Sequence, residues 1–267
     1  MTTRKGPSLR LPIMMAASVR DRSLLKKTPG LGQQAHWLLP LVLSTTAGAV
    51  DVIGFLALGG LFTAHITGNL VVLAAHYITG RFGEVAPLLS VPVFAVVLGI
   101  VTLVFVRKPI QIARRALLVL QAVLLACFLG FGVRFGPFPD PNNGMAVFVG
   151  MLGVAAMATQ NGLVRLGLPG APSTAVMTTN VTQLTVDLAT LVRGQSEQTE
   201  LPRVRRRADL TAISVLGFAI GLALGAAFEI RFGLWSLIFP VILAALAIPL
   251  GETWTGSNDR ASHPARA

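Results

Sequence analysis

Charged residues are scarce in this 267-residue chain, and acidic residues are the scarcest of them. Charged side chains make up 12% of the residues, with 11 Asp and Glu against 22 Lys and Arg, whereas 53% of the residues are hydrophobic. The mean hydropathy is +0.70. A soluble core does not require so apolar a composition, which is typical of a polytopic membrane protein. We therefore expect the lipid bilayer to be the main partner of this chain.

Signatures of catalysis and of cofactor binding are also missing. The single cysteine, Cys127, lies in an apolar stretch, so the sequence offers no disulfide framework and no thiolate metal site. The four histidines lie far apart, and no phosphate-binding P-loop, His-Glu-x-x-His or Cys-x-x-Cys motif occurs. The serines lack a recognisable nucleophile motif. We therefore expect no enzymatic activity, cofactor or bound metal.

The excess of basic residues, a net charge of +11, does not indicate a nucleic-acid partner. These residues lie in the tails and in the short links between apolar runs, where they orient helices in a membrane. Residues 1–38 hold seven basic residues and one acid, and we expect a disordered cytoplasmic tail there unless translation starts at Met14 or Met15. A second disordered tail, also cytoplasmic, is expected over 251–267.

Eight apolar runs follow one another through a single predicted domain, residues 39–250. Most of the runs reach the roughly 20 residues with which a helix crosses about 30 Å of hydrocarbon. They cover approximately residues 39–61, 62–80, 87–106, 116–134, 144–164, 173–192, 209–230 and 232–250. The sequence therefore predicts an all-α membrane protein with short connections.

Positive charge favours six crossings over eight. If all eight runs cross, the four basic residues within 107–115 lie on the outer side, against the tendency of Lys and Arg to stay in the cytoplasm. If 62–80 and 173–192 instead enter and leave on the same side, the basic residues left outside are Arg81, Arg134 and Arg231. We therefore predict about six spanning helices and two re-entrant or broken segments.

The two halves of the chain carry a similar pattern of polar residues. Asp51 is followed by Thr67-Gly68-Asn69, and Gln160-Asn161 by Thr178-Thr179-Asn180. With three crossings in each half, the second half enters the membrane in the opposite orientation, which is the inverted-repeat architecture of many secondary transporters. We expect repeat one at 39–134 and repeat two at 144–250. Eight spans in two parallel repeats are the alternative.

Asp51, His65 and Asp187 are the candidate coupling residues. Asp51 lies near the middle of the first apolar run, where a carboxylate costs roughly 2.5–3.5 kcal/mol on insertion scales. Histidine titrates near neutrality, and Asp and His side chains together can relay protons. In the alternative interpretation Asp51 and His65 are hydrogen-bonded structural residues, and Asp187 reaches toward the nearer membrane interface.

The two Thr-x-Asn motifs are predicted helix starts. Thr and Asn are favourable N-caps, and the free N–H groups of a helix start attract anions together with the helix dipole. Capping alone is the alternative role. The candidate solute-binding residues are Thr67, Gly68, Asn69, Gln160, Asn161, Thr178, Thr179, Asn180 and Gln183.

Four segments resemble the YoaK family of bacterial inner-membrane proteins, a family with a domain of unknown function. They are Gly-x-Val-Asp-x-Ile-Gly-Phe-Leu at 48–56, Thr-Gly-Asn at 67–69, Gln-Asn-Gly at 160–162 and the Thr-rich stretch 174–182. The resemblance covers about 39–250 and implies about six spans. It departs from the family pattern at Thr179, where glycine is expected, and it implies no particular substrate.

These observations predict a proton-coupled secondary transporter of a small polar or anionic solute in the bacterial cytoplasmic (inner) membrane. Asp51 would carry the coupling proton, and the Thr-x-Asn helix starts would hold the solute. A passive channel and a non-transporting scaffold or accessory protein are the alternatives. A homo-oligomer is compatible with all three.

Overall fold

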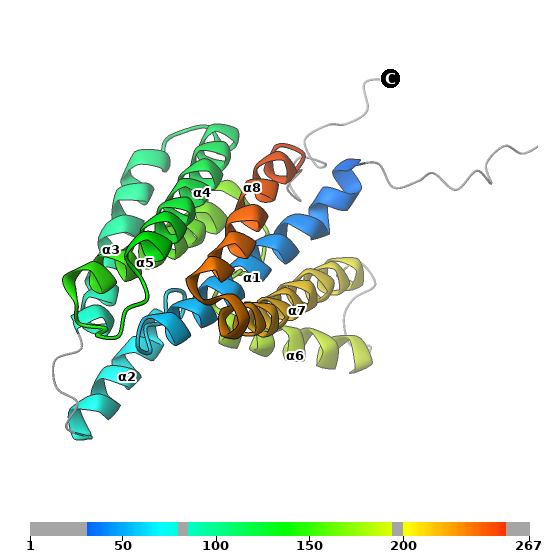
Figure 1. Cartoon of the computed structure of the whole chain (residues 1–267). Coiled ribbons are helices and arrows are strands. Elements are labelled where there is room, and N and C mark those ends of the chain that lie inside the picture. Colours follow the sequence, from blue (N-terminus) through cyan, green and yellow to red (C-terminus); the bar gives the residue numbers. More distant parts are fainter. Residues whose placement is uncertain (1–30, 80–84, 194–199, 255–267) are drawn as a thin grey trace, which may run out of the picture.

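The structure, a computed structural model, describes residues 31–79, 85–193 and 200–254. This part of the chain contains eight α-helices and one short 3-10 helix, with no β-strand (Figure 1). The helices are α1 (Leu31–Ala57), α2 (Ile66–Ile78), α3 (Val85–Phe105), α4 (Ile110–Phe135), α5 (Gly144–Gly167), α6 (Met177–Arg193), α7 (Leu201–Phe232), η2 (Gly233–Leu237) and α8 (Ile238–Glu252).

Five stretches of helix are long and apolar enough to cross a membrane. The last of them, residues 201–252, contains both α7 and α8, which are separated at Gly233, a residue with φ +57°. Six apolar helices therefore result, and the predicted all-α polytopic fold is confirmed. α2, with 13 residues, is shorter than a full crossing requires, and α6, with 17, is at the lower limit and is not among the five apolar stretches, whereas α8 together with η2 covers residues 233–252.

The packing of the helices follows two equivalent sets, α1 to α4 and α5 to α8. α1 packs against α7, and its counterpart α5 packs against α3. Likewise α2 contacts α3 and α6 contacts α7, while α1 contacts α8 and α5 contacts α4. In Figure 1, α1 and α5 run in opposite directions through the bundle, and α2 and α6 lead away toward opposite ends. This arrangement is the one expected of inverted repeats.

α1 is the central helix, and glycine allows α7 to approach it closely. A Cβ atom added at Gly221 would lie 2.2 Å from the carbonyl oxygen of Thr45, and one added at Gly48 would lie 2.3 Å from that of Phe218. Any larger side chain would push the two backbones apart. By contrast, α3 lies at the periphery, and only 11% of the residues in its apolar stretch are buried. Asp51 is thus carried by the most enclosed helix of the bundle.

The predicted tails need correction at their inner boundaries. α1 begins at Leu31, inside the predicted N-terminal tail, and α8 continues to Glu252, inside the predicted C-terminal tail. The side chain of Trp254 is buried, with 3% exposed, because it packs with the cluster around Leu117 and Leu163. Residues 1–30 and 255–267 of the predicted tails lie outside the described residues.

Candidate functional site

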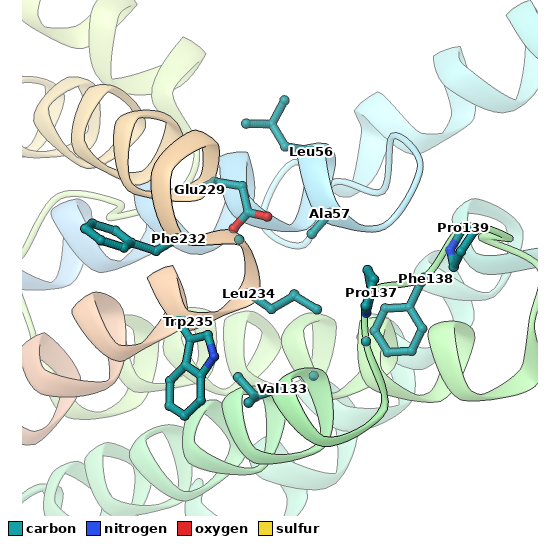
Figure 2. Close-up of a pocket in the computed structure, with 13 residues that line it drawn as sticks. Leu56, Ala57, Val133, Pro137, Phe138, Pro139, Glu229, Phe232, Leu234 and Trp235 are labelled. Carbon is teal, nitrogen blue, oxygen red and sulfur yellow. The ribbon is translucent and has the colours of Figure 1, made fainter.

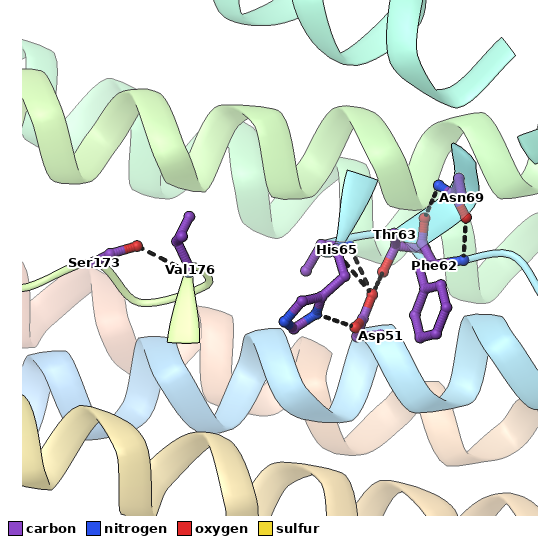
Figure 3. Close-up of polar contacts among 8 residues, drawn as sticks. Asp51, Phe62, Thr63, His65, Asn69, Ser173 and Val176 are labelled. Atoms are coloured by element: carbon purple, nitrogen blue, oxygen red, sulfur yellow. Dashed lines mark hydrogen bonds and ion pairs between the residues drawn. The ribbon is translucent and has the colours of Figure 1, made fainter. Parts of the chain in front are cut away.

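Two non-helical segments interrupt the bundle between α1 and α5. We call residues 58–65, which precede α2, the first break, and residues 168–176, which precede α6, the second break. Figure 3 shows parts of both breaks lying in line, with α1 on one side and α5 on the other, and with α2 and α6 starting from them. The starts of the two short helices are therefore brought to the same level of the molecule.

Asp51 of α1 holds the first break. Its carboxylate is buried, and Oδ1 accepts hydrogen bonds from the N–H groups of Ala64 at 2.7 Å and of His65 at 3.3 Å (Figure 3). The hydroxyl of Thr63 donates to the same oxygen at 3.5 Å. These donors compensate the carboxylate for its burial, because hydrogen bonds to charged groups are about twice as strong as neutral ones.

The second oxygen of Asp51 contacts an imidazole. Oδ2 lies 2.6 Å from Nδ1 of His65, and the ring of His65 packs edge-on against Phe218 with centroids 5.2 Å apart. His65 is also the residue before α2, but its side chain forms no cap hydrogen bond to that helix. About 34% of the side chain is exposed. The structure therefore brings Asp51 and His65, both predicted coupling residues, together as one hydrogen-bonded pair.

Asn69 closes the first break from the other side. Its Oδ1 accepts from the N–H of Phe62 at 2.8 Å, and its Nδ2 donates to the carbonyl of Phe62 at 2.7 Å and to Oγ of Ser90 at 2.8 Å. Thr67 is exposed, whereas a Cβ added at Gly68 would lie 3.0 Å from the ring of Phe62. The amide of Asn69 is thus used within the protein to shape the break.

The second break repeats this design with neutral groups. Nδ2 of Asn180 donates to the carbonyl of Ser173 at 2.5 Å, seven residues back, as Asn69 does to Phe62. Nε2 of Gln160 donates to the hydroxyl of Thr174 at 2.7 Å and to the carbonyl of Leu43 at 3.0 Å. Gln160 therefore holds a threonine of the second break as Asp51 holds Thr63 of the first.

Neighbouring residues complete the support of Gln160. Its Oε1 accepts from Nε2 of Gln121 at 2.6 Å, which ties α4 and α5 to the second break. Asn161, the second amide of the predicted Gln160-Asn161 motif, instead donates to the carbonyl of Met157 one turn earlier, at 2.9 Å. Of the two adjacent amides, Gln160 therefore contacts the second break, and Asn161 hydrogen-bonds within α5.

Two cavities flank the second break and share part of its backbone. One, of about 330 Å³, is lined by polar groups that include Asn161, Arg165 and Thr179. The other, of about 250 Å³, is lined by groups that include Asn180, Gln183 and Arg207. Gly170, Ala171, Ser173 and Thr179 line both cavities. Four of the predicted solute-binding residues are therefore brought together here, while Thr178 is exposed and lines neither cavity.

Asp187 is not brought to the pair formed by Asp51 and His65. Its Oδ2 accepts from Nε of Arg207 at 2.9 Å and its Oδ1 from Nη2 at 2.5 Å, a two-bond contact between α6 and α7. Gln183 donates to Oδ1 at 2.8 Å. Such a contact fixes geometry as well as charge. Arg207 carries no distinctive sequence signal, because it lies in a basic stretch, residues 203–207, that resembles an ordinary flank of a membrane helix.

Other residues of the site carried too weak a signal in the sequence. Thr63, Thr174 and Ser90 are buried polar residues whose roles depend on which helices meet. Within the described residues no group of three or more His, Cys, Asp or Glu side chains is placed to hold a metal ion.

Comparison with known proteins identifies a family. A family described as a protein of unknown function, DUF1275, matches residues 39–250, which include both breaks and the helices that flank them except the start of α1. No curated protein and no solved structure matches the chain. The match covers well over half of the sequence and agrees with the resemblance noted from the Asp51 and Asn69 motifs. The chain belongs to the DUF1275 family.

Proposed function

We propose that the protein is a proton-coupled secondary transporter of a small anionic solute. The proton binds at the pair formed by Asp51 and His65 in the first break. The solute binds at the second break, in the cavities beside the start of α6. The protein lies in the bacterial cytoplasmic membrane, with both termini in the cytoplasm.

The difference in charge between the two breaks is the observation that carries this proposal. In the first break a built-in carboxylate already accepts from the backbone N–H groups of residues 64 and 65. In the second break the N–H groups of Ala175 and Val176 donate instead to the neutral hydroxyl of Ser173, at 3.4 and 2.9 Å. Because no carboxylate occupies this helix start, its dipole and its N–H groups can attract an anion.

A basic side chain adds to this attraction. Arg165 lines the larger cavity of the second break, whereas Arg207, which lines the smaller one, already donates to Asp187. Arginine suits carboxylate and phosphate groups because its planar guanidinium can donate two parallel hydrogen bonds. The volumes of about 330 and 250 Å³ suit a solute of a few carbon atoms. The proposed solute is therefore a short carboxylate or a comparably small oxyanion.

Coupling follows from the closeness of the two breaks. A negative solute at the second break favours protonation of the pair at the first, and protonation favours the solute by the same factor, because coupling between sites is reciprocal. Alternating access would come from rocking of the two repeats about the breaks. The link from α3 to α4 carries Arg107 and Lys108 and lies at the end of the bundle where α8 ends (Figure 1), with Arg115 of α4 3.6 Å from Glu252, which supports a cytoplasmic C-terminus.

Purified protein in liposomes that contain a trapped pH dye tests the proposal. Short monocarboxylates, dicarboxylates and inorganic phosphate are added outside, and the wild-type protein should acidify the interior with one class of them. Asp51→Asn should abolish the acidification, because the amide cannot take up the proton and nearly preserves the shape. Asp209→Asn, a matched change at an exposed position on α7, should leave it unchanged.

Two outcomes would contradict the proposal. Undiminished acidification by Asp51→Asn would remove the coupling role of that residue. Solute movement that only equalises concentrations, even with a proton gradient imposed, would instead indicate a passive channel.

A further inference from the structure

A separate cavity lies at the C-terminal end of α1, beside the start of the first break and apart from the two cavities of the second break. It has a volume of about 470 Å³ and is formed by the ends of α1, α4 and α7 together with η2 (Figure 2). Its walls are mostly apolar and include aromatic rings from Phe138, Phe232 and Trp235. This volume lies in the range of small-molecule sites.

One acidic side chain gives this cavity its chemistry. Glu229 of α7 lines the cavity, half-buried, and Figure 2 shows its carboxylate directed into the space between the helix ends. Its Oε2 accepts a hydrogen bond from the hydroxyl of Ser236 at 2.5 Å, which holds the group in place. A carboxylate in partly apolar surroundings attracts a cation more strongly than one in water.

Within the described residues no basic side chain pairs with Glu229. Arg231 instead lies over the ring of Phe232, 5.7 Å from its centroid, and Arg134 lies over Phe135 at 5.4 Å. Neither arginine lines the cavity. The carboxyl group of Glu229 therefore has no cationic partner among the described side chains.

The composition of the walls selects the type of cation. Ca²⁺ and Mg²⁺ require about six or more oxygen ligands, and the cavity supplies one carboxylate. Aromatic faces attract organic ammonium groups, and apolar walls accept the rest of such a molecule. We propose that this cavity binds an organic cation, a primary or quaternary ammonium with a small apolar or aromatic body. The proposal is independent of the transport function proposed above.

At the opposite end of the bundle, two glycines allow close packing at the equivalent place. There the equivalent ends of α5 and α8 close against the start of α4. A Cβ added at Gly167 would lie 3.0 Å from Cα of Arg114, and one added at Gly251 would lie 2.3 Å from Cδ1 of Leu118.

Benzyltrimethylammonium is the probe for this site, measured by isothermal titration of the full-length protein in neutral detergent. Wild-type protein should bind it saturably, and Glu229→Gln should weaken the affinity at least tenfold. Glu252→Gln is the matched control, because Glu252 is exposed at the other end of the bundle and pairs with Arg115 at 3.6 Å. Benzyl alcohol, which lacks the charge, should bind wild type and Glu229→Gln alike.

A second measurement uses wild-type protein and so does not depend on the folding of a variant. Carbodiimide modifies accessible carboxyl groups, and benzyltrimethylammonium should slow the modification of Glu229, but not of Glu252, as followed by mass spectrometry. Equal affinity of wild type and Glu229→Gln, or modification of Glu229 at the same rate with and without the probe, would overturn the proposal.

Discussion

The first and second breaks are built alike but hold different charges. In each, an asparagine of the following helix donates to a carbonyl seven residues back, and a buried threonine contacts a polar side chain of the preceding long helix. That side chain is the acid Asp51 in one break and the amide Gln160 in the other. The comparison separates the part of the site that builds a broken helix from the part that determines what can bind there.

The shared part explains why the breaks can exist inside the bundle. Non-helical backbone at membrane depth is tolerated only where protein groups or water satisfy its N–H and C=O groups. Asn69 supplies such contacts in the first break, and Asn180 supplies one in the second. The variable part, acid or amide, is then free to differ between the repeats, and we infer that it separates proton binding from solute binding.

The largest expected effect follows from removing the acid. Asp51→Ala should lower the free energy of unfolding by about 3–5 kcal/mol, because it breaks a buried pair and leaves two N–H groups without their acceptor. Gln160→Ala should cost roughly 2–3 kcal/mol, because the groups that it leaves are neutral. Unfolding by SDS in mixed micelles measures both values. Equal losses would mean that the charge of Asp51 adds nothing to the stability of its break.

Replacing the asparagine of the first break should also lower the free energy of unfolding more than replacing the asparagine of the second. Asn69→Ala removes hydrogen bonds to the backbone of Phe62 and to Ser90 and should cost roughly 2–3 kcal/mol. Asn180→Ala removes the bond to Ser173 and a long contact to Sδ of Met177, and should cost about 1 kcal/mol. The same SDS titration compares them. A larger loss in Asn180→Ala would reverse our ranking of the two breaks.

The fold was accessible from the sequence because its signals are long and repetitive. Apolar runs of roughly 20 residues gave the spanning helices, and the distribution of Lys and Arg gave the two short segments, which the structure has as α2 and α6. Helix ends were less accessible: α1 begins at Leu31 in a stretch with little hydrophobic character, and α7 begins at Leu201 among basic residues.

The site was only partly accessible for a physical reason. Asp51 and the asparagines stand out because a polar residue in an apolar run is rare. The contact between Asp51 and His65 and that between Asp187 and Arg207 depend on how the breaks fold and on which helices meet. Gln160, and not the adjacent Asn161, donates to Thr174 of the second break, because neighbouring residues on a helix point in different directions. A weak repeat cannot specify which of the two points toward the break.

The crossings of the long helices offer a further contrast between the repeats. Gly221→Ala on α7 places a methyl group against the backbone of α1 and should cost about 1–3 kcal/mol, because two helix backbones must separate. Gly162→Ala on α5 meets a methyl group of Val101 on the peripheral α3, which can shift, and should cost less than about 1 kcal/mol. Melting temperatures in one detergent rank the two variants. Equal losses would show that both crossings are equally rigid.

The smallest energetic effect belongs to the changes that test the inversion itself. In a Cys127→Ala background, single cysteines replace Thr79 at the end of α2 and Gln111 at the start of α4, both exposed positions where the cost should stay within about 0.5 kcal/mol. In intact cells a membrane-impermeant thiol reagent should label position 79 but not position 111, because α2 returns to the side that it came from. Labelling at 111 but not 79 would mean that the segment crosses. The repeats would then be parallel and both breaks would open to the same side of the membrane, so the division between a proton site and a solute site would lose its geometric basis.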